Sequence, residues 1–207
     1  MTTELAFVGD VHGNRSALQG LLDELSARGG PHAVFLGDYI NKGSESAGVV
    51  EQLLAYSQSG EATLLRGNHE EALLDAIDTG NLSTFLKLGG AMTIRSYVGG
   101  KVGPDVLRDL QTSLPQEHLD AIRCMPETYE LDDLVARHIP PATSTQKYRI
   151  SAHVPVGELP RIGRHSANLD TGCGDDTGRL TALIWPSLEY FQVDADGAIV
   201  SGETDEG

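Results

Sequence analysis

Apolar and polar residues follow two different periods in the first eighty residues of the chain. Short apolar runs predict buried strands at 4–8, 32–36 and 62–65. Between and after them, apolar residues recur every three or four positions, which predicts helices after Asn14, at 45–58 and around 72–77. This alternation of strands and helices predicts parallel strands that are joined by crossover helices.

The second half of the chain has a different pattern. We expect one more helix near 115–124, followed by seven short apolar segments that proline, glycine or aspartate separate. The strands predicted there are 127–131, 133–138, 148–152, 166–170, 180–185, 189–193 and 198–200. The whole pattern predicts an α/β fold in which helices flank two packed β-sheets. We expect a single domain at 1–200 and a frayed tail at 201–207.

Composition and charge narrow the classes of protein. A length of 207 residues suits one sizeable α/β domain. The formal net charge of −15 makes nucleic acid an unfavourable partner, although bound metal ions could still attract phosphate groups. We expect neither a membrane span nor an export signal, because no long apolar segment occurs. The two cysteines, Cys124 and Cys173, favour a cytoplasmic protein and leave a single disulfide open.

Each of the three early strands ends in a glycine that polar residues follow. These segments read GDVHG at 9–13, GDYINKG at 37–43 and GNHE at 67–70. The carboxyl ends of parallel strands lie at one edge of a sheet, so we expect the polar side chains to meet there. They are Asp10, His12, Asp38, Asn68 and His69. One such segment is common in ordinary turns, but three in succession favour a metal site with oxygen and nitrogen ligands, which suits Mn, Fe, Zn or Ni.

Four longer segments resemble those of a known protein family. They read LLRGNHE at 64–70, LGGAMTIRSY at 88–97, SAHVPV at 151–156 and NLDTGCGDDTGRLTAL at 168–183. Together with the three turns, they resemble the calcineurin-like metallophosphoesterases, and specifically their phosphoprotein phosphatase branch. That branch includes bacterial serine/threonine phosphatases and diadenosine tetraphosphate hydrolases. The resemblance covers most of the chain and implies an α/β/β/α sandwich of two sheets.

The resemblance also implies which residues hold metal. Asp10 and His12 would bind the first of two divalent ions, and Asp38 would bridge both ions. Asn68 and His153 would bind the second ion. We expect manganese, with iron, zinc and nickel as alternatives.

The remaining implied roles concern catalysis and phosphate binding. The family hydrolyses phosphate esters with a hydroxide that bridges the two metal ions. His69 would protonate the leaving oxygen, and Asn68 and Lys42 would contact the phosphate. Asn41 stands where the family has an aspartate that orients the catalytic histidine; it can accept a hydrogen bond but carries no charge. Lys42 replaces an arginine and lacks its bidentate fork.

A second departure from the family lies before the Ile-Pro-Pro segment. In that alignment the family's metal-binding histidine falls on Ala136, and His138 stands where glycine is usual. Residues two apart share a face of a strand, so His138 could reach the second metal through a local kink. The other interpretation is that His138 is a surface or neighbouring residue, and the second metal then has one ligand fewer.

Asp-Thr-Gly occurs three times, at 78–80, 170–172 and 176–178. An aspartic protease would need two such carboxylates to face each other from separate halves. We interpret the triplets as turns.

We predict a metal-dependent serine/threonine phosphoprotein phosphatase, whose partner is a phosphorylated protein. The first alternative is a hydrolase of dinucleoside polyphosphates or of another small phosphoester. The second is a degenerate, non-catalytic phosphate-binding protein, which Asn41 and Ala136 favour and the retained aspartates and histidines disfavour.

Overall fold

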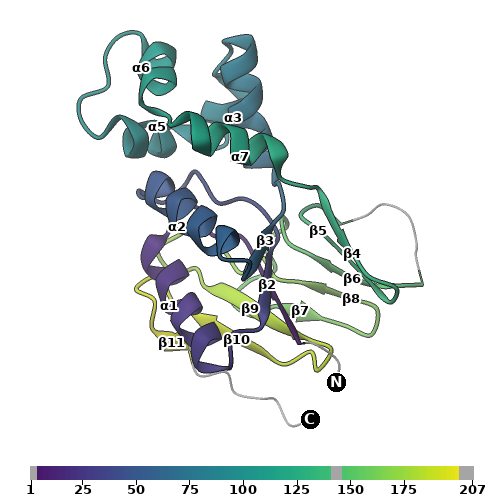
Figure 1. Ribbon diagram of the computed structural model, residues 1–207. Coiled ribbons are helices and arrows are strands. Elements are labelled where there is room, and N and C mark those ends of the chain that lie inside the picture. The colour runs from purple at the N-terminus through teal and green to yellow at the C-terminus, as the bar shows by residue number, and fades with distance from the viewer. Residues whose placement is uncertain (1–3, 141–145, 201–207) are drawn as a thin grey trace.

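Two β-sheets packed face to face lie at the centre of the molecule (Figure 1). The structure, a computed structural model, describes residues 4–140 and 146–200, so the expected tail at 201–207 lies outside the described residues. Sheet A has the strand order β11-β10-β9-β1-β2-β3, and sheet B has the order β4-β5-β6-β8-β7. The predicted α/β sandwich of two sheets flanked by helices is confirmed.

Sheet A contains the three early strands at one side. Its strands are β1 (Leu5–Val8), β2 (His32–Phe35), β3 (Ala62–Leu64), β9 (Leu180–Trp185), β10 (Tyr190–Val193) and β11 (Ile199–Val200). As predicted, β1, β2 and β3 are parallel, and the crossover helices are α1 (Arg15–Ala27) and α2 (Ser46–Gln58). All four residues of β1 are buried because helices cover one face of the strand and sheet B covers the other.

Sheet B is built from the later short strands. They are β4 (Thr128–Glu130), β5 (Leu134–Arg137), β6 (Tyr148–Ser151), β7 (Arg161–Ile162) and β8 (Ser166–Asn168). Its three central strands are parallel, and β4 and β7 are antiparallel edges. Alternate residues such as Ala136, Ile150 and Ala167 lie in the core between the sheets. The two-residue strand β7 was not predicted, because so short a segment has no periodic pattern.

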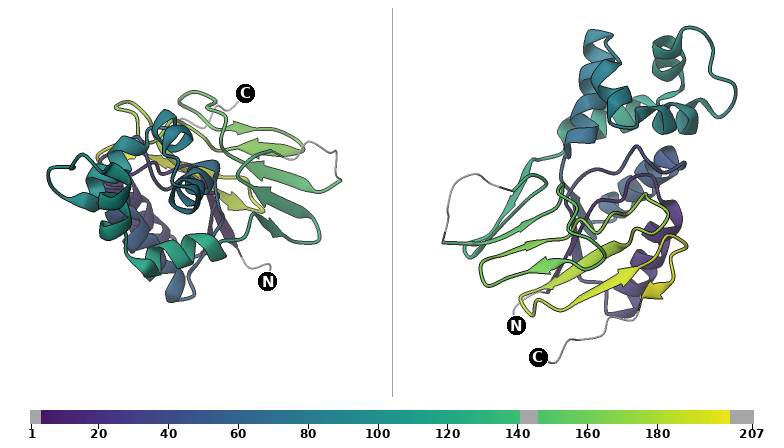
Figure 2. Two further views of the ribbon diagram at one scale, coloured as in Figure 1. Left: turned by 90° about the horizontal axis from the view of Figure 1, so that it is seen from above. Right: turned by 180° about the vertical axis from the view of Figure 1, so that it is seen from behind.

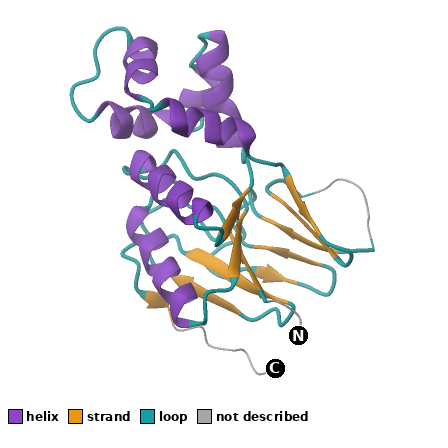
Figure 3. Cartoon of the chain, in the orientation of Figure 1, coloured by secondary structure: helices purple, strands orange, loops and turns teal. Residues whose placement is uncertain are grey.

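The helices occupy two places. Helices α1 and α2 pack on sheet A, on the side of the sandwich away from sheet B (Figure 2). The others stand beyond the end of β3, as the purple ribbons of Figure 3 show. They are α3 (Asn68–Thr79), α4 (Ser83–Lys87), α5 (Gly90–Val98), α6 (Val106–Ser113) and α7 (Gln116–Cys124). Helices α4, α5 and α6, of five, nine and eight residues, were not predicted. No described helix has the length and apolar character that a membrane crossing needs.

Helix α1 touches the turn between β10 and β11 through a glycine. A Cβ atom on Gly20 would lie 2.0 Å from the carbonyl oxygen of Gly197, far inside contact distance. Gly48, in α2, differs, because the nearest atom to its Cβ position belongs to the flexible side chain of Arg15, at 3.0 Å. A side chain at position 20 would therefore collide with backbone, whereas a side chain at position 48 would meet only a side chain that can move.

We expect Gly20→Ala to destabilise the protein although alanine is the better helix former. Without the clash, the exchange would stabilise a helix by about 0.5–1 kcal/mol. Here backbone must move, at a cost of roughly 1–3 kcal/mol. In urea unfolding, the midpoint should fall for Gly20→Ala and stay level or rise for the control Gly48→Ala. Equal midpoints for the two variants would contradict the close packing of α1 on this turn.

Candidate metal centre

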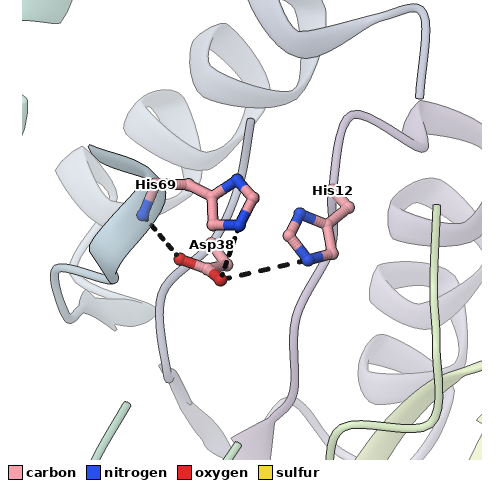
Figure 4. Close-up of side chains that lie close together, drawn as sticks. All are labelled: His12, Asp38 and His69. Carbon is pink, nitrogen blue, oxygen red and sulfur yellow. Dashed lines mark hydrogen bonds and ion pairs between the residues drawn. The ribbon is translucent and has the colours of Figure 1, made fainter. Parts of the chain in front are cut away.

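Polar side chains from the ends of β1, β2 and β3 meet around the Asp38 carboxylate. Its Oδ2 atom lies 3.9 Å from Nε2 of His12 and 3.6 Å from Nε2 of His69 (Figure 4). The two imidazole rings are edge to face, with centroids 4.7 Å apart. Asp10 adds a second carboxylate, 3.8 Å from His12. All four side chains are buried, so the three turns form one enclosed polar cluster.

Sheet B contributes two more histidines to this cluster. His138 follows β5 directly, and its Nε2 atom lies 3.2 Å from Oδ2 of Asp38 and 2.8 Å from Oδ1 of Asn68. His153 follows β6, and its Nδ1 atom lies 2.8 Å from the same oxygen of Asn68. The rings of His138 and His153 are 5.0 Å apart. The cluster therefore spans the carboxyl ends of strands from both sheets.

The structure places His138 inside the cluster and not at the surface. The residue is only 3% exposed, and its Nδ1 atom lies 3.6 Å from Oδ1 of Asp10. Ala136, two positions earlier, pairs with Ile150 and lies in the core between the sheets. The surface interpretation of His138 is therefore wrong. Its position at the metal cluster makes it a candidate ligand in place of the histidine missing at Ala136.

Asn41 contacts His69 through its amide nitrogen. The Nδ2 atom lies 2.7 Å from Nδ1 of His69, while Oδ1 accepts a hydrogen bond of 2.7 Å from the hydroxyl of Thr93. The backbone N–H of Asn41 donates in turn to the Thr93 oxygen, at 2.8 Å. In this arrangement the amide nitrogen is the donor to Nδ1, and a neutral ring would then carry its proton on Nε2. Thr93, in the unpredicted helix α5, fixes this orientation.

The backbone of the site is held in an uncommon conformation. Among the described residues, six that are not glycine have positive φ, and five of them belong to this region. They are His12 (47°), Asp38 (56°), Asn41 (72°), Lys42 (52°) and His153 (71°). Such backbone costs of order 1 kcal/mol or more per residue and persists only where the surroundings hold it.

A buried glutamate holds the turn that carries Asp38. The Glu70 carboxylate accepts hydrogen bonds from the backbone N–H groups of Asp38, Tyr39 and Gly67, at 2.9, 2.8 and 3.1 Å. Burial, followed by the negative charge of Asp38, raises the pKa of Glu70 to about 7, although two of these N–H bonds act in the opposite direction. No role was predicted for Glu70 beyond its place in the GNHE segment, because two of its three partners, Asp38 and Tyr39, lie some thirty residues earlier in the chain.

The loop after β8 closes the cluster on another side. A Cβ atom on Gly174 would lie 2.5 Å from Cβ of His12, so this loop packs directly on the site. Asp170 begins an Asp-Thr-Gly turn, in which its Oδ1 accepts a hydrogen bond from the N–H of Gly172. The turn was predicted. Sequence reasoning missed that Asp170 is only 1% exposed and lies close enough to Asp10 for its negative charge to raise the pKa of Asp10.

Cys173 lies in the same loop and forms no disulfide. Its thiol donates a hydrogen bond to the carbonyl of Val11, and burial raises its pKa to about 12. Cys124 is exposed, and both cysteines are free. The disulfide that the sequence left open is therefore absent.

The electrostatics of the cluster fit bound cations. Burial, then the charges of Asp38 and Asp170, raise the pKa of Asp10 well above its ordinary value. Burial also acts to raise the pKa of Asp38, but hydrogen bonding and charge from His138 and the other histidines lower it to about 2. Oδ1 of Asp10 and Nδ1 of His138 are buried, face each other and have no hydrogen-bond partner. Buried polar atoms are rarely left unpaired, so a cation between them would satisfy both.

Two sets of potential ligand atoms share one carboxylate. His12, Asp38 and His69 form one set, and Asp38, His138 and His153 form the other, each with ligand atoms within 4.8 Å of one another. Imidazole nitrogens and carboxylate oxygens without thiolates suit first-row divalent ions. The shared Asp38 makes two adjacent ions the arrangement that these residues fit best.

Comparisons with known proteins agree with this geometry. The family model for the calcineurin-like phosphoesterases matches residues 3–202. The chain is 33% identical over 95 residues to the zinc-dependent endopolyphosphatase of Saccharomyces cerevisiae, a match that spans 45% of this chain and 28% of that protein. A solved structure assigned provisionally as a diadenosine tetraphosphatase superposes with a TM-score of 0.67 at 20% identity, over 94% of each chain. A metallophosphoesterase from Sphaerobacter thermophilus superposes with a TM-score of 0.54 at 16% identity, over 96% of this chain and 88% of that chain. At these identities the two structural likenesses show the fold alone.

We expect Glu70→Gln to lower the free energy of unfolding by about 1–3 kcal/mol. An amide has one accepting oxygen, and its NH₂ group would face backbone N–H donors that the carboxylate now satisfies. Urea unfolding measures the difference, with Glu71→Gln as a matched control. Glu71 follows Glu70 in α3 but is exposed, so its exchange should stay within about 0.5 kcal/mol. Equal effects would contradict the structural role of Glu70.

Proposed function

The chain belongs to the calcineurin-like phosphoesterases, which are metal-dependent hydrolases of phosphate esters, and from that premise we propose that its substrate is a phosphoserine or phosphothreonine side chain of a protein. The observation that carries this choice is the size of the hollow beside the cluster. It measures about 120 Å³, and Asn68 and His138 line it together with two arginines and the two glutamates that pair with them, which are Arg66, Arg137, Glu71 and Glu127. A site for a whole small molecule is usually larger, about 300–1,000 Å³, whereas one phosphoryl group needs far less.

The rim of the site supports a protein substrate. Ile139 and Val154 directly follow His138 and His153, and they are 49% and 51% exposed. Exposed apolar side chains next to a polar cluster offer contacts to the residues that flank a phosphorylated side chain. We propose that this rim holds the peptide on either side of the phosphate.

The residues proposed to hold metal fall into two groups around Asp38. Asp10 and His12 would bind one ion, and Asn68, His153 and His138 the other, with manganese as the proposed metal. Bound divalent ions activate water and neutralise the charge of phosphoryl oxygens.

His69 and Lys42 are the proposed groups for the substrate itself. With the amide nitrogen of Asn41 beside Nδ1, the proposed form of His69 carries its proton on Nε2, on the side of the cluster, where it would donate a hydrogen bond to the leaving oxygen. Lys42 is half-buried next to this cluster, and its charge would attract the phosphate. The hydrogen bonds of Thr93 keep Asn41, and through it His69, in this orientation.

A second candidate substrate is a phosphoanhydride, such as a dinucleoside polyphosphate or a polyphosphate. The observation that favours it is the neutral amide of Asn41 at the imidazole. A phosphate leaving group needs less protonation than the alkoxide of serine, so a hydrogen-bond donor without charge is sufficient. One similar protein is named as an endopolyphosphatase and another as a diadenosine tetraphosphatase. Family membership argues against the non-catalytic alternative.

We expect Asp38→Asn to lose metal and activity together. An asparagine has one neutral oxygen with which to bind, and the carboxylate is shared by both sets of ligand atoms. Elemental analysis of the purified variant should find fewer than one ion per chain, against about two in the parent protein. The exposed Asp23→Asn serves as the control and should retain both ions. Unchanged metal content in Asp38→Asn would contradict the shared carboxylate.

We expect His69→Ala to lower turnover by roughly 10²–10⁴ for alkyl phosphates and by much less for aryl phosphates. Aryl leaving groups need little help from a donor, so the ratio of the two losses reports the role of His69. Equal losses for both substrates would contradict that role.

Asn41→Asp then separates the two candidate substrates, with Asn14→Asp, at the start of α1, as a control for the added charge. A rise in alkyl phosphate turnover that aryl phosphates do not share supports a phosphoserine or phosphothreonine substrate. A fall in the turnover of alkyl phosphates, with the turnover of a polyphosphate unchanged, supports a phosphoanhydride substrate.

A further inference from the structure

A second polar pocket lies on sheet B, apart from the metal cluster. Its volume is about 330 Å³, and strands β6, β7 and β8 supply most of its lining. The polar side chains that line it are Arg149, Ser151, Arg161, Ser166 and Asn168. None of the described residues that line it is acidic.

Strand register explains why these side chains share one face. Arg149 pairs with Ser166 across β6 and β8, and Arg161 pairs with Asn168 across β7 and β8. The alternate residues Ile150 and Ala167 belong to the core between the two sheets. Side chains on either side of them therefore point away from sheet A. In Figure 2 this face of sheet B carries no described helix.

The two arginines of the pocket have no carboxylate partner among the described residues, as is also true of exposed arginines such as Arg164. Within the described chain, neither Arg149 nor Arg161 takes part in an ion pair, whereas Arg66, Arg123 and Arg179 all pair with carboxylates. Two like charges that share a pocket also repel each other.

One nitrogen atom of the half-buried Arg149 side chain is buried without a hydrogen bond. The Nε atom of Arg149 is inaccessible to solvent and has no acceptor. The two serines offer hydroxyl donors beside it, and within the described part of the chain the Ser151 hydroxyl donates one long hydrogen bond, of 3.5 Å, to the carbonyl of Ala167. A buried charged donor without an acceptor is costly, which indicates that an acceptor binds here.

We propose that this pocket binds a phosphate-type oxyanion. Two guanidinium forks and two hydroxyl groups match the several acceptor oxygens and the negative charge of such a group. The pocket lies near the metal cluster along the chain, because Ser151 precedes His153 by two residues and Pro140, also in the lining, follows His138 by two. The oxyanion is therefore either a second phosphate of an extended substrate or free phosphate.

Inorganic phosphate, titrated into the zinc-loaded protein, tests binding directly. Phosphate also reaches the metal cluster, so the readout is the NMR signal of each arginine Nε–H group. The signals of Arg149 and Arg161 should shift and saturate together. In Arg149→Gln, the concentration that half-saturates the shift of Arg161 should rise at least about tenfold.

Arg164→Gln is the matched control. Arg164 lies three residues after Arg161, is exposed, and does not line the pocket. Its exchange removes the same charge and should change the half-saturating concentration less than about twofold. The proposal is overturned if Arg149 and Arg161 shift no more than Arg164, or if Arg164→Gln weakens binding as much as Arg149→Gln.

Kinetics then distinguish the two sources of the oxyanion. If the KM for tripolyphosphate rises about tenfold in Arg149→Gln while that for p-nitrophenyl phosphate is unchanged, the ligand is a second phosphate of the substrate. If neither KM changes while the NMR shifts persist, the ligand is free phosphate. Binding is measured without turnover, so a failure of the proposed phosphatase activity would leave this pocket independently testable.

Discussion

The site depends on one buried carboxylate whose hydrogen bonds go to the backbone. Glu70 accepts three backbone hydrogen bonds, from the turn after β2 and from the start of α3. These bonds hold the peptide of Asp38 in the left-handed region, which places its side chain between the histidines of both sheets. The backbone N–H of His69 then donates a hydrogen bond of 3.0 Å to the Asp38 carboxylate. The carboxylate at the centre of the cluster therefore also helps to hold the start of α3 in place.

The early turns were predictable because their cause is local. An apolar run, a glycine and a polar residue mark the end of a buried strand, and parallel strands bring such ends together. Asp10, His12, Asp38 and His69 follow this logic, and the structure brings them into one cluster. The parallel order of β1, β2 and β3 was predictable for the same reason.

What the sequence did not predict depends on distant contacts. Thr93 acts through a hydrogen bond to a residue 52 positions earlier, a contact that no local pattern in the sequence indicates. His138 was ambiguous because strand alternation alone cannot show how the chain turns after β5. Asp170 was assigned to a turn, correctly, yet its burial beside Asp10 depends on how the loop after β8 packs on sheet A.

The left-handed backbone at five residues of the site also limits how the protein can evolve. A β-branched side chain pays a steric penalty there that asparagine, aspartate or glycine largely avoids. His12, Asn41 and His153 are thus selected by backbone shape as well as by chemistry. Backbone shape alone permits an exchange between asparagine and aspartate at these positions, whereas valine, isoleucine or threonine would first have to remodel the turn. The set of accessible active-site variants is consequently narrower than side-chain chemistry alone would allow.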